Sequence, residues 1–302
     1  MHCGRSFRFG NVVAVFSRRR DDIVSVRIDE CELINRNASD VGTDGPTGGA
    51  ILAYTRNPKL GANPEPPHED AEVTLALTRS IVRTPKGTAV FAMNFASHGT
   101  VTIRLKKNDV GGPLDVIGGL SRPDAVVGAT TTITSHGNQY SPSEASDAVA
   151  AWQIIGGSGP PFQPGANSNA DSNSASVESR DDQIRGFQVG IVAAGGRRLR
   201  SDGGTCSHNK ARLELLHMTL ATKDTEAADF NFTGALGPSP AGSANIVYVL
   251  VQKTTGSGPR RNVYANGATG NRLVFVGTLD AFTRSNPEID PAPSAEFFKP
   301  VG

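Results

Sequence analysis

Clustered arginines are the side chains of this sequence with the clearest potential for chemistry. A guanidinium group presents a planar fork of donors that matches phosphate and carboxylate oxygens. If the fold gathers the clusters on one face, they would bind nucleic acid, and without interleaved aromatic residues they would contact its phosphate backbone rather than its bases. The residues predicted to contact phosphates are Arg18, Arg19, Arg20, Arg197, Arg198, Arg200, Arg260 and Arg261.

The alternative is an ordinary solvated surface on which nearby carboxylates neutralise these arginines. Asp21, Asp22, Asp202 and Glu214 lie close to the clusters in the sequence. The formal net charge of the chain is only +1, so a phosphate-binding surface would have to be local.

Catalytic and metal-binding residues form no comparable pattern. Cys206, His208 and His217 are the group closest to a metal cluster, but their spacing does not match the Cys-x₂₋₄-Cys or His-x₃₋₅-His pairs usual in zinc sites. The chain contains no Gly-x-Ser-x-Gly elbow, no Gly-x-x-x-x-Gly-Lys loop and no His-Glu-x-x-His motif. We therefore expect a protein that is not an enzyme and that uses neither a cofactor nor a metal.

The fold class follows from the spacing of apolar residues. Large apolar residues alternate with small, polar or charged ones in residues 73–78, 91–95 and 101–105. This period of two is typical of strands that bury one face and expose the other. About nine or ten such strands predict an all-β fold, an antiparallel β-sandwich of the jelly-roll type with long loops. No internal repeat is evident.

One short helix is predicted at about residues 142–153. Residues 141–144 read Ser-Pro-Ser-Glu, which is a capping box with proline at the first helical position. Apolar residues then follow at three- to four-residue spacing up to Trp152, the one tryptophan of the chain. This side chain would anchor the helix to the sheet.

The domain organisation follows from composition. We predict a short basic arm at 1–22, a single β-sandwich domain at 23–285 with a flexible Asn- and Ser-rich loop at 156–182, and a Pro-rich tail at 286–302. Three widely spaced cysteines are no disulfide framework. No secretory signal is expected, and no stretch approaches the ~20 apolar residues of a membrane-spanning helix. We therefore expect no contact with a membrane.

The segment Phe187–Arg200 resembles jelly-roll coat proteins of small RNA viruses. In it, an aliphatic strand runs through Ala194 and Gly195 into arginines that alternate with an apolar residue. The resemblance implies a capsid-type structural protein of the virion, present also in the host cytoplasm, that assembles with copies of itself and binds genomic nucleic acid, most simply RNA. Such coats commonly carry a long basic arm, and here that arm is short.

Two alternatives remain open at this stage. The first is a non-catalytic β-sandwich module that binds a carbohydrate or a protein through the loop at Asn167–Ser176. The second is a β-rich hydrolase with dispersed catalytic residues, for which His68, His98, His136 and His208 are candidates. Two of these histidines beside a carboxylate in one pocket would favour the hydrolase.

Overall fold

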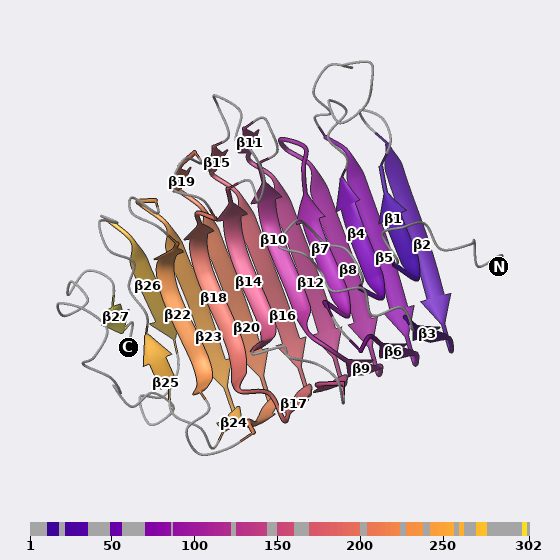
Figure 1. The fold of residues 1–302 in the computed structure, drawn as a ribbon. Helices are drawn as coiled ribbons and strands as arrows, with labels where there is room; N and C mark the ends of the chain where they lie inside the picture. The colour runs from indigo at the N-terminus through magenta and orange to yellow at the C-terminus, as the bar shows by residue number, and fades with distance from the viewer. Residues whose placement is uncertain are drawn as a thin grey trace.

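The fold is a stack of β-strand coils, seen in a computed structural model (Figure 1). The structure describes residues 11–17, 22–35, 49–55, 70–85, 87–121, 125–143, 150–159, 169–199, 204–223, 228–237, 242–256, 260–262, 270–276 and 298–300. Within these ranges, no helix is long and apolar enough to cross a membrane.

The chain visits the same sheets in the same order in each coil. Sheet A consists of β1 (Val13–Phe16), β4 (Ile51–Thr55), β7 (Val90–Asn94), β10 (Leu114–Leu120), β14 (Ala150–Ser158), β18 (Val189–Arg197), β22 (Ala228–Leu236) and β25 (Arg260–Asn262). Sheet B consists of β2 (Ile23–Asp29), β5 (Glu72–Thr78), β8 (Thr100–Lys106), β12 (Thr130–His136), β16 (Ser174–Arg180), β20 (Lys210–Leu216), β23 (Ile246–Gln252), β26 (Arg272–Val276) and β27 (Phe298–Pro300).

Two narrower sheets complete the coils. Sheet C consists of β3 (Glu32–Ile34), β6 (Ile81–Arg83), β9 (Asp109–Gly111), β13 (Gln139–Ser141), β17 (Gln183–Arg185), β21 (Thr219–Ala221) and β24 (Thr255–Gly256). Sheet D lies between sheets A and B and consists of β11 (Val126–Val127), β15 (Ala170–Asp171) and β19 (Cys206–Ser207). All pairings between described strands are parallel, so the fold is a parallel β-helix.

A strict module recurs in seven successive coils. A seven-residue strand of sheet B is followed by one residue with positive φ, one corner residue and a short strand of sheet C. The positive-φ residues at this B–C corner are Glu30, Arg79, Lys107, Gly137, Asp181, His217 and Lys253. A left-handed residue lets the backbone turn sharply without breaking the pairing of the strands on either side.

The second, fourth and sixth residues of each seven-residue strand of sheet B point into the coil. In β5 these are Val73, Leu75 and Leu77, and all three are fully buried. In β8 they are Val101, Ile103 and Leu105. Each such side chain stabilises the fold by roughly 1.5–3 kcal/mol when fully buried, and the inward residues of sheets A, B and C form one continuous core.

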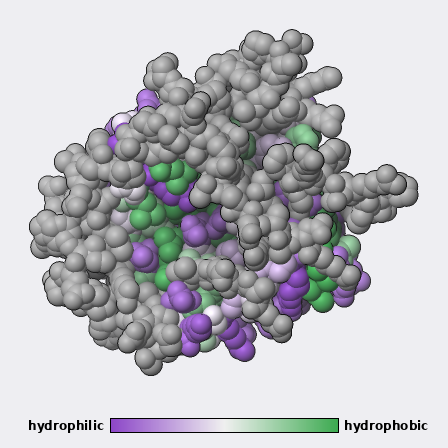
Figure 2. Space-filling model, viewed as in Figure 1, coloured by the Kyte–Doolittle hydropathy of each residue, from purple (hydrophilic) through white to green (hydrophobic). Residues whose placement is uncertain are grey.

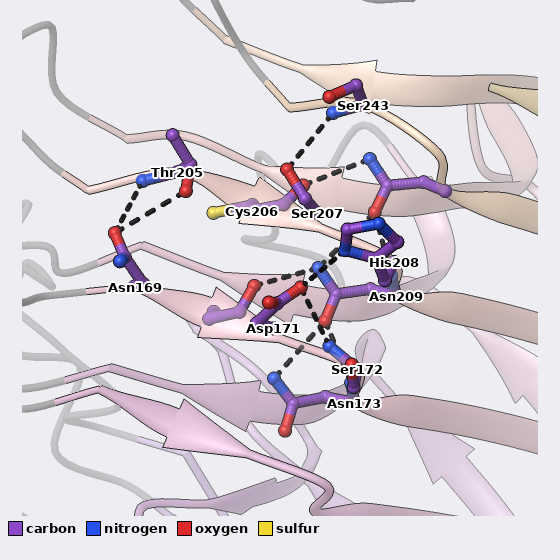
Figure 3. Close-up of polar contacts among 12 residues, drawn as sticks. Asn169, Asp171, Ser172, Asn173, Thr205, Cys206, Ser207, His208, Asn209 and Ser243 are labelled. Atoms are coloured by element: carbon purple, nitrogen blue, oxygen red, sulfur yellow. Dashed lines mark hydrogen bonds and ion pairs between the residues drawn. The ribbon is translucent and has the colours of Figure 1, made fainter. Parts of the chain in front are cut away.

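A ladder of asparagines runs along the corner where the chain enters sheet B. The side-chain oxygens of Asn173, Asn209, Asn245 and Asn271 each accept from the backbone N–H one coil earlier, at 2.9 Å in every case. Figure 3 shows Asn173 and Asn209 in this ladder. The ladder satisfies backbone donors that the turn would otherwise leave buried and unpaired.

A second ladder runs along the B–C corner. It connects Ser80, Asn108, Asn138 and Asp182, each side-chain oxygen accepting from the backbone N–H of the residue before it in this series, at 2.9, 2.8 and 2.6 Å. Side-chain amides and one carboxylate therefore accept backbone N–H groups at both corners, where the chain enters sheet B and where it leaves it.

Paired glycines in sheet A make room for the first ladder. A Cβ on Gly157 would lie 2.4 Å from Asn209 Oδ1, and a Cβ on Gly156 would lie 2.4 Å from the backbone oxygen of Gly195. The pairs 118–119 and 195–196 occupy equivalent places. The chain therefore does contain an internal repeat, contrary to the sequence-based expectation.

The predicted antiparallel jelly-roll sandwich is wrong. Apolar and polar residues alternate in the same way along a one-sided buried strand whether its sheet is parallel or antiparallel. The alternation therefore predicts strands correctly but does not reveal the direction in which they pair. The predicted helix at 142–153 is wrong in its described part, because Ala150–Ser158 forms β14. Trp152 is an inward residue of this strand and packs edge-to-face on Tyr140, with ring centroids 5.1 Å apart.

The stretch 156–182 also contains regular structure. It includes the end of β14, the whole of β15 and the whole of β16. Residues 160–168 and 144–149 lie outside the described part of the chain.

Removal of one asparagine should test how much the first ladder contributes to stability. Asn209→Ala leaves the buried N–H of Asn173 without its acceptor at 2.9 Å, which costs roughly 1–3 kcal/mol. Denaturant unfolding should show this loss, whereas Lys210→Ala on the outer face should change stability by less than about 0.5 kcal/mol. Equal losses in the two variants would contradict a structural role for the ladder.

Asp182→Asn should test the ionisation of the carboxyl at the end of the second ladder. Burial raises the pKa of Asp182 above its ordinary value of 3.8, against the hydrogen bonds from Ser179 and Asn138. The unfolding free energy contributed by this group is therefore full below pH 3.8 and falls as the pH rises through the raised pKa. The variant should lose this fall and be more stable than the wild type at neutral pH, measured by thermal unfolding between pH 4 and 8. A variant with the wild-type pH slope would contradict this assignment.

Candidate binding face

The outer side of sheet B is the most regular surface of the described molecule. Its seven-residue strands pair without offset, so outward residues of successive coils stand in rows across the strands. Residues one, three, five and seven of each strand face outward. We call the row formed by the third strand residues the polar row: Ser25, Thr74, Thr102, Thr132, Ser176, Arg212 and Tyr248.

Every member of the polar row carries a hydrogen-bonding group. Five consecutive coils contribute hydroxyls, and the next two contribute a guanidinium and a phenol. Neighbouring members are separated by about 4.8 Å, the spacing of hydrogen-bonded strands. The neighbouring row, at the first strand position, adds the hydroxyls of Thr100, Thr130 and Ser174.

The hydroxyls retain capacity for a ligand. The Ser176 hydroxyl donates to Thr132 Oγ1 at 3.1 Å. A hydroxyl offers one donor and two acceptor sites, so Thr132 keeps its own proton for another partner. Both side chains are partly exposed.

Arg212 is held in place at the end of the hydroxyl series. It donates to Glu214 Oε1 through Nε at 3.0 Å, and its guanidinium carbon lies 5.3 Å from the centroid of the Tyr248 ring. The hydrogen bond to Glu214 raises the pKa of Arg212 above its ordinary value. A fixed guanidinium next to a half-exposed ring offers a planar donor and a stacking surface side by side.

The predicted phosphate-binding arginines do not form this face. Arg197 and Arg198 lie at the end of β18 in sheet A, and both are half-buried. Arg260 and Arg261 belong to β25, also in sheet A, and their side chains lie outside the description. Arg18, Arg19, Arg20 and Arg200 lie outside the described residues altogether.

Arg197 belongs instead to a polar cluster on the outer side of sheet A. Its Nε donates to Ser158 Oγ at 3.2 Å. Burial raises the pKa of Asp115, while the hydrogen bond from Thr88 at 2.6 Å and the charge of Arg197 oppose this shift. Burial likewise lowers the pKa of Arg197, and the charge of Asp115 counters it. The charge of each group therefore opposes the shift of the other only in part, since the pKa of Asp115 stays raised and that of Arg197 stays lowered.

The suspected metal residues are kept apart by the coil. Cys206 and His208 lie at the A–B corner, and His217 lies at the opposite end of β20. Burial raises the pKa of the Cys206 thiol to about 11, so it is protonated at neutral pH. No three histidines, cysteines or carboxylates in the described residues are arranged to hold a metal ion.

The candidate histidines do not share a pocket. His98 and His208 occupy positive-φ positions at the A–B corner, where His208 Nδ1 lies 3.0 Å from Asp171 Oδ1 (Figure 3). His136 lies at the B–C corner, 3.4 Å from a carboxylate oxygen of Asp181. His217 Nδ1 lies 3.4 Å from the other carboxylate oxygen of Asp181. These exposed groups stand at separate corners, and His68 lies outside the described residues.

The other broad face presents a mixed surface. Figure 2, viewed as in Figure 1, shows apolar and polar side chains side by side between segments whose placement is not described. The outer residues of sheet A include a second apolar cluster with Met93, Ile117 and Ile155, which are nearly fully buried. Among the described residues, the hydroxyls of sheet B are therefore more exposed than these apolar side chains of sheet A.

Sequence reasoning missed the polar row, although a signal for it exists. The first and third strand residues read Thr-x-Thr in β8 and β12 and Ser-x-Ser in β16. This recurrence becomes meaningful only when the strands are known to be parallel and in register.

A double-mutant cycle should measure the coupling between Arg197 and Asp115. Arg197→Met removes the cation that offsets the buried carboxylate, and Asp115→Asn removes the carboxylate itself. The first change should destabilise the wild type more than it destabilises the Asp115→Asn variant, as measured by denaturant unfolding. Strict additivity would show that the two charges do not interact.

Comparison with known proteins gives no relative for this chain. No protein-family model, curated protein or solved structure matches it. Its own side chains and their geometry are therefore the basis for a functional proposal.

Proposed function

We propose that this chain is a binding module for an extended carbohydrate polymer, which lies along the polar row of sheet B. The observation that carries the proposal is the row itself, in which five hydroxyl side chains on consecutive coils stand in register. Their spacing of about 4.8 Å is close to the length of one sugar residue in an extended polysaccharide. Each coil would then meet one sugar.

The chemistry of the row suits a polyhydroxylated ligand. Hydroxyl groups both donate and accept, as sugar hydroxyls do, so the two sets can pair without leaving unmatched charge. The parallel hydroxyls of Thr100, Thr130 and Ser174 would give each sugar a second contact. At the end of the row, the Tyr248 ring offers a surface for the apolar face of a sugar ring.

A capsid-type role with RNA binding stays a prediction. The jelly-roll fold that the viral resemblance implied is wrong for this chain. The two predicted phosphate-binding arginines with described side chains lie half-buried on sheet A. The hydroxyl row therefore supports carbohydrate binding better than the arginines support nucleic-acid binding.

Affinity electrophoresis in gels containing soluble xylan, mixed-linkage β-glucan or galactomannan should test the proposal. The wild type should be retarded by at least one polymer. Thr102→Val with Thr132→Val keeps the shape of both side chains and removes two hydroxyls. At roughly 0.5–1.5 kcal/mol for each lost hydrogen bond, affinity should fall about tenfold. Thr219→Val, an exposed hydroxyl on sheet C, is the matched control and should bind as the wild type does.

Two results would overturn the proposal. One is the absence of retardation by every polysaccharide, and the other is equal affinity of the double variant and the control. A parallel gel with RNA separates the rival prediction, because retention by RNA alone would favour the nucleic-acid role.

A further inference from the structure

Exposed cations lie on the three strands that carry paired hydroxyls. Strands β8, β12 and β16 each have a hydroxyl at the first and third positions. The last residues of the same strands, Lys106, His136 and Arg180, are exposed and stand in register. Arg104, at the fifth position of β8, and Lys107, at the corner that follows, are exposed as well. We use the term cationic band for Arg104, Lys106, Lys107 and Arg180.

Most of the cationic band has no acidic partner within the described part of the chain. On the same side of the molecule, Arg79 pairs with Asp29 at 2.7 Å. By contrast, Arg104, Lys106 and Lys107 form no ion pair with a described carboxylate. Three positive groups therefore remain available to a negatively charged ligand.

The band is locally positive although the formal charge of the whole chain is only +1. Among the outward residues of these three strands and the positive-φ residues that follow them, the carboxylates are Glu178 and Asp181. Arg180 Nε lies 3.6 Å from an oxygen of Asp181. Exposed charges of one sign attract anions over about a Debye length, which is roughly 10 Å at 0.1 M salt.

A polymer on the polar row would lie within reach of the band. Arg104 follows Thr102 of the polar row by two residues, which is about 6.8 Å along the strand, and Lys106 lies about 6.8 Å further. Both side chains are long and end in several hydrogen-bond donors. Acidic substituents project sideways from a sugar chain, so they would extend from the row toward these two cations.

The same strands are less suited to a nucleic acid. Their outward positions carry hydroxyls and no aromatic ring on which a base could stack. We infer that the polymer bound by the polar row is an acidic polysaccharide, whose carboxylate groups contact the cationic band. This inference rests on the proposed function and specifies the class of its ligand.

Carboxymethyl cellulose and hydroxyethyl cellulose test the inference, because they share one backbone and differ in the charge of their substituents. Binding to the immobilised protein should be measured by biolayer interferometry at low salt. The wild type should bind the carboxymethyl polymer about fivefold more tightly, because several exposed ion pairs each add a small gain. The preference should shrink at about 0.5 M salt, which screens exposed charges, whereas binding of the hydroxyethyl polymer should change little.

Arg104→Gln with Lys106→Gln removes two charges from the band and leaves the polar row intact. The preference for the carboxymethyl polymer should fall below about twofold, while the affinity for hydroxyethyl cellulose stays at the wild-type level. Arg185→Gln with Lys223→Gln is the matched control, because it removes two exposed charges that lie outside sheet B. The control should keep the preference.

The possible results separate this inference from the proposed function. Equal affinity of the wild type for both celluloses would overturn the acidic ligand and leave carbohydrate binding standing. Binding of neither cellulose would also overturn it, and the gels with neutral polymers would then decide the proposed function on their own. A preference that survives Arg104→Gln with Lys106→Gln would exclude the cationic band as its source. Tighter binding of polyuridylate RNA than of carboxymethyl cellulose would assign the band to nucleic acid instead.

Discussion

Satisfying backbone donors at the two corners of sheet B is the constraint on which the whole molecule depends. A coil must turn sharply out of one sheet and into the next, and its N–H groups there would be buried without a strand partner. A left-handed residue makes each turn, and along the two ladders the next side chain accepts the N–H of the previous coil. Because each of these hydrogen bonds also fixes the position of the following coil, the ladders hold strands β5 to β26 of sheet B in register.

Because of this register, residues that alternate along each strand form continuous rows on the two faces of sheet B. The inward positions of β5, β8 and β12 give a continuous core, and the outward positions give the polar row. The same register explains why hydroxyls as far apart in sequence as Thr74 and Ser176 belong to one line. The paired glycines of sheet A belong to the same system, since they leave space for the asparagine side chains.

The strands could be predicted from the sequence, but their pairing could not. Alternation in residues 73–78 and 101–105 correctly indicated strands with one buried face, and these are β5 and β8. The repeat was hidden because its spacing varies: the strand at Glu72 is followed by one at Thr100, whereas the strand at Thr130 is followed only at Ser174. Insertions of this kind are common between coils and mask the period.

The candidate face was harder to predict than the core. Outward hydroxyls carry no burial signal, and only the register shows that Thr102, Thr132 and Ser176 are neighbours. The place of Trp152 was hard to predict for a related reason. Its spacing from preceding alanines suits a helix, yet its side chain fills the inside of β14 against Tyr140. Tertiary packing outweighed a local capping signal here.

The invariant two-residue B–C corner has a practical consequence. That corner has the same length in seven coils, while the path from sheet C back to sheet A ranges from two residues after Gly111 to sixteen after Ile34. The return path thus tolerates extra chain without altering the pitch of the stack. Foreign peptides grafted between Ser141 and Ala150 would be displayed on a rigid scaffold, and several grafts on different coils would stand at fixed, programmable intervals.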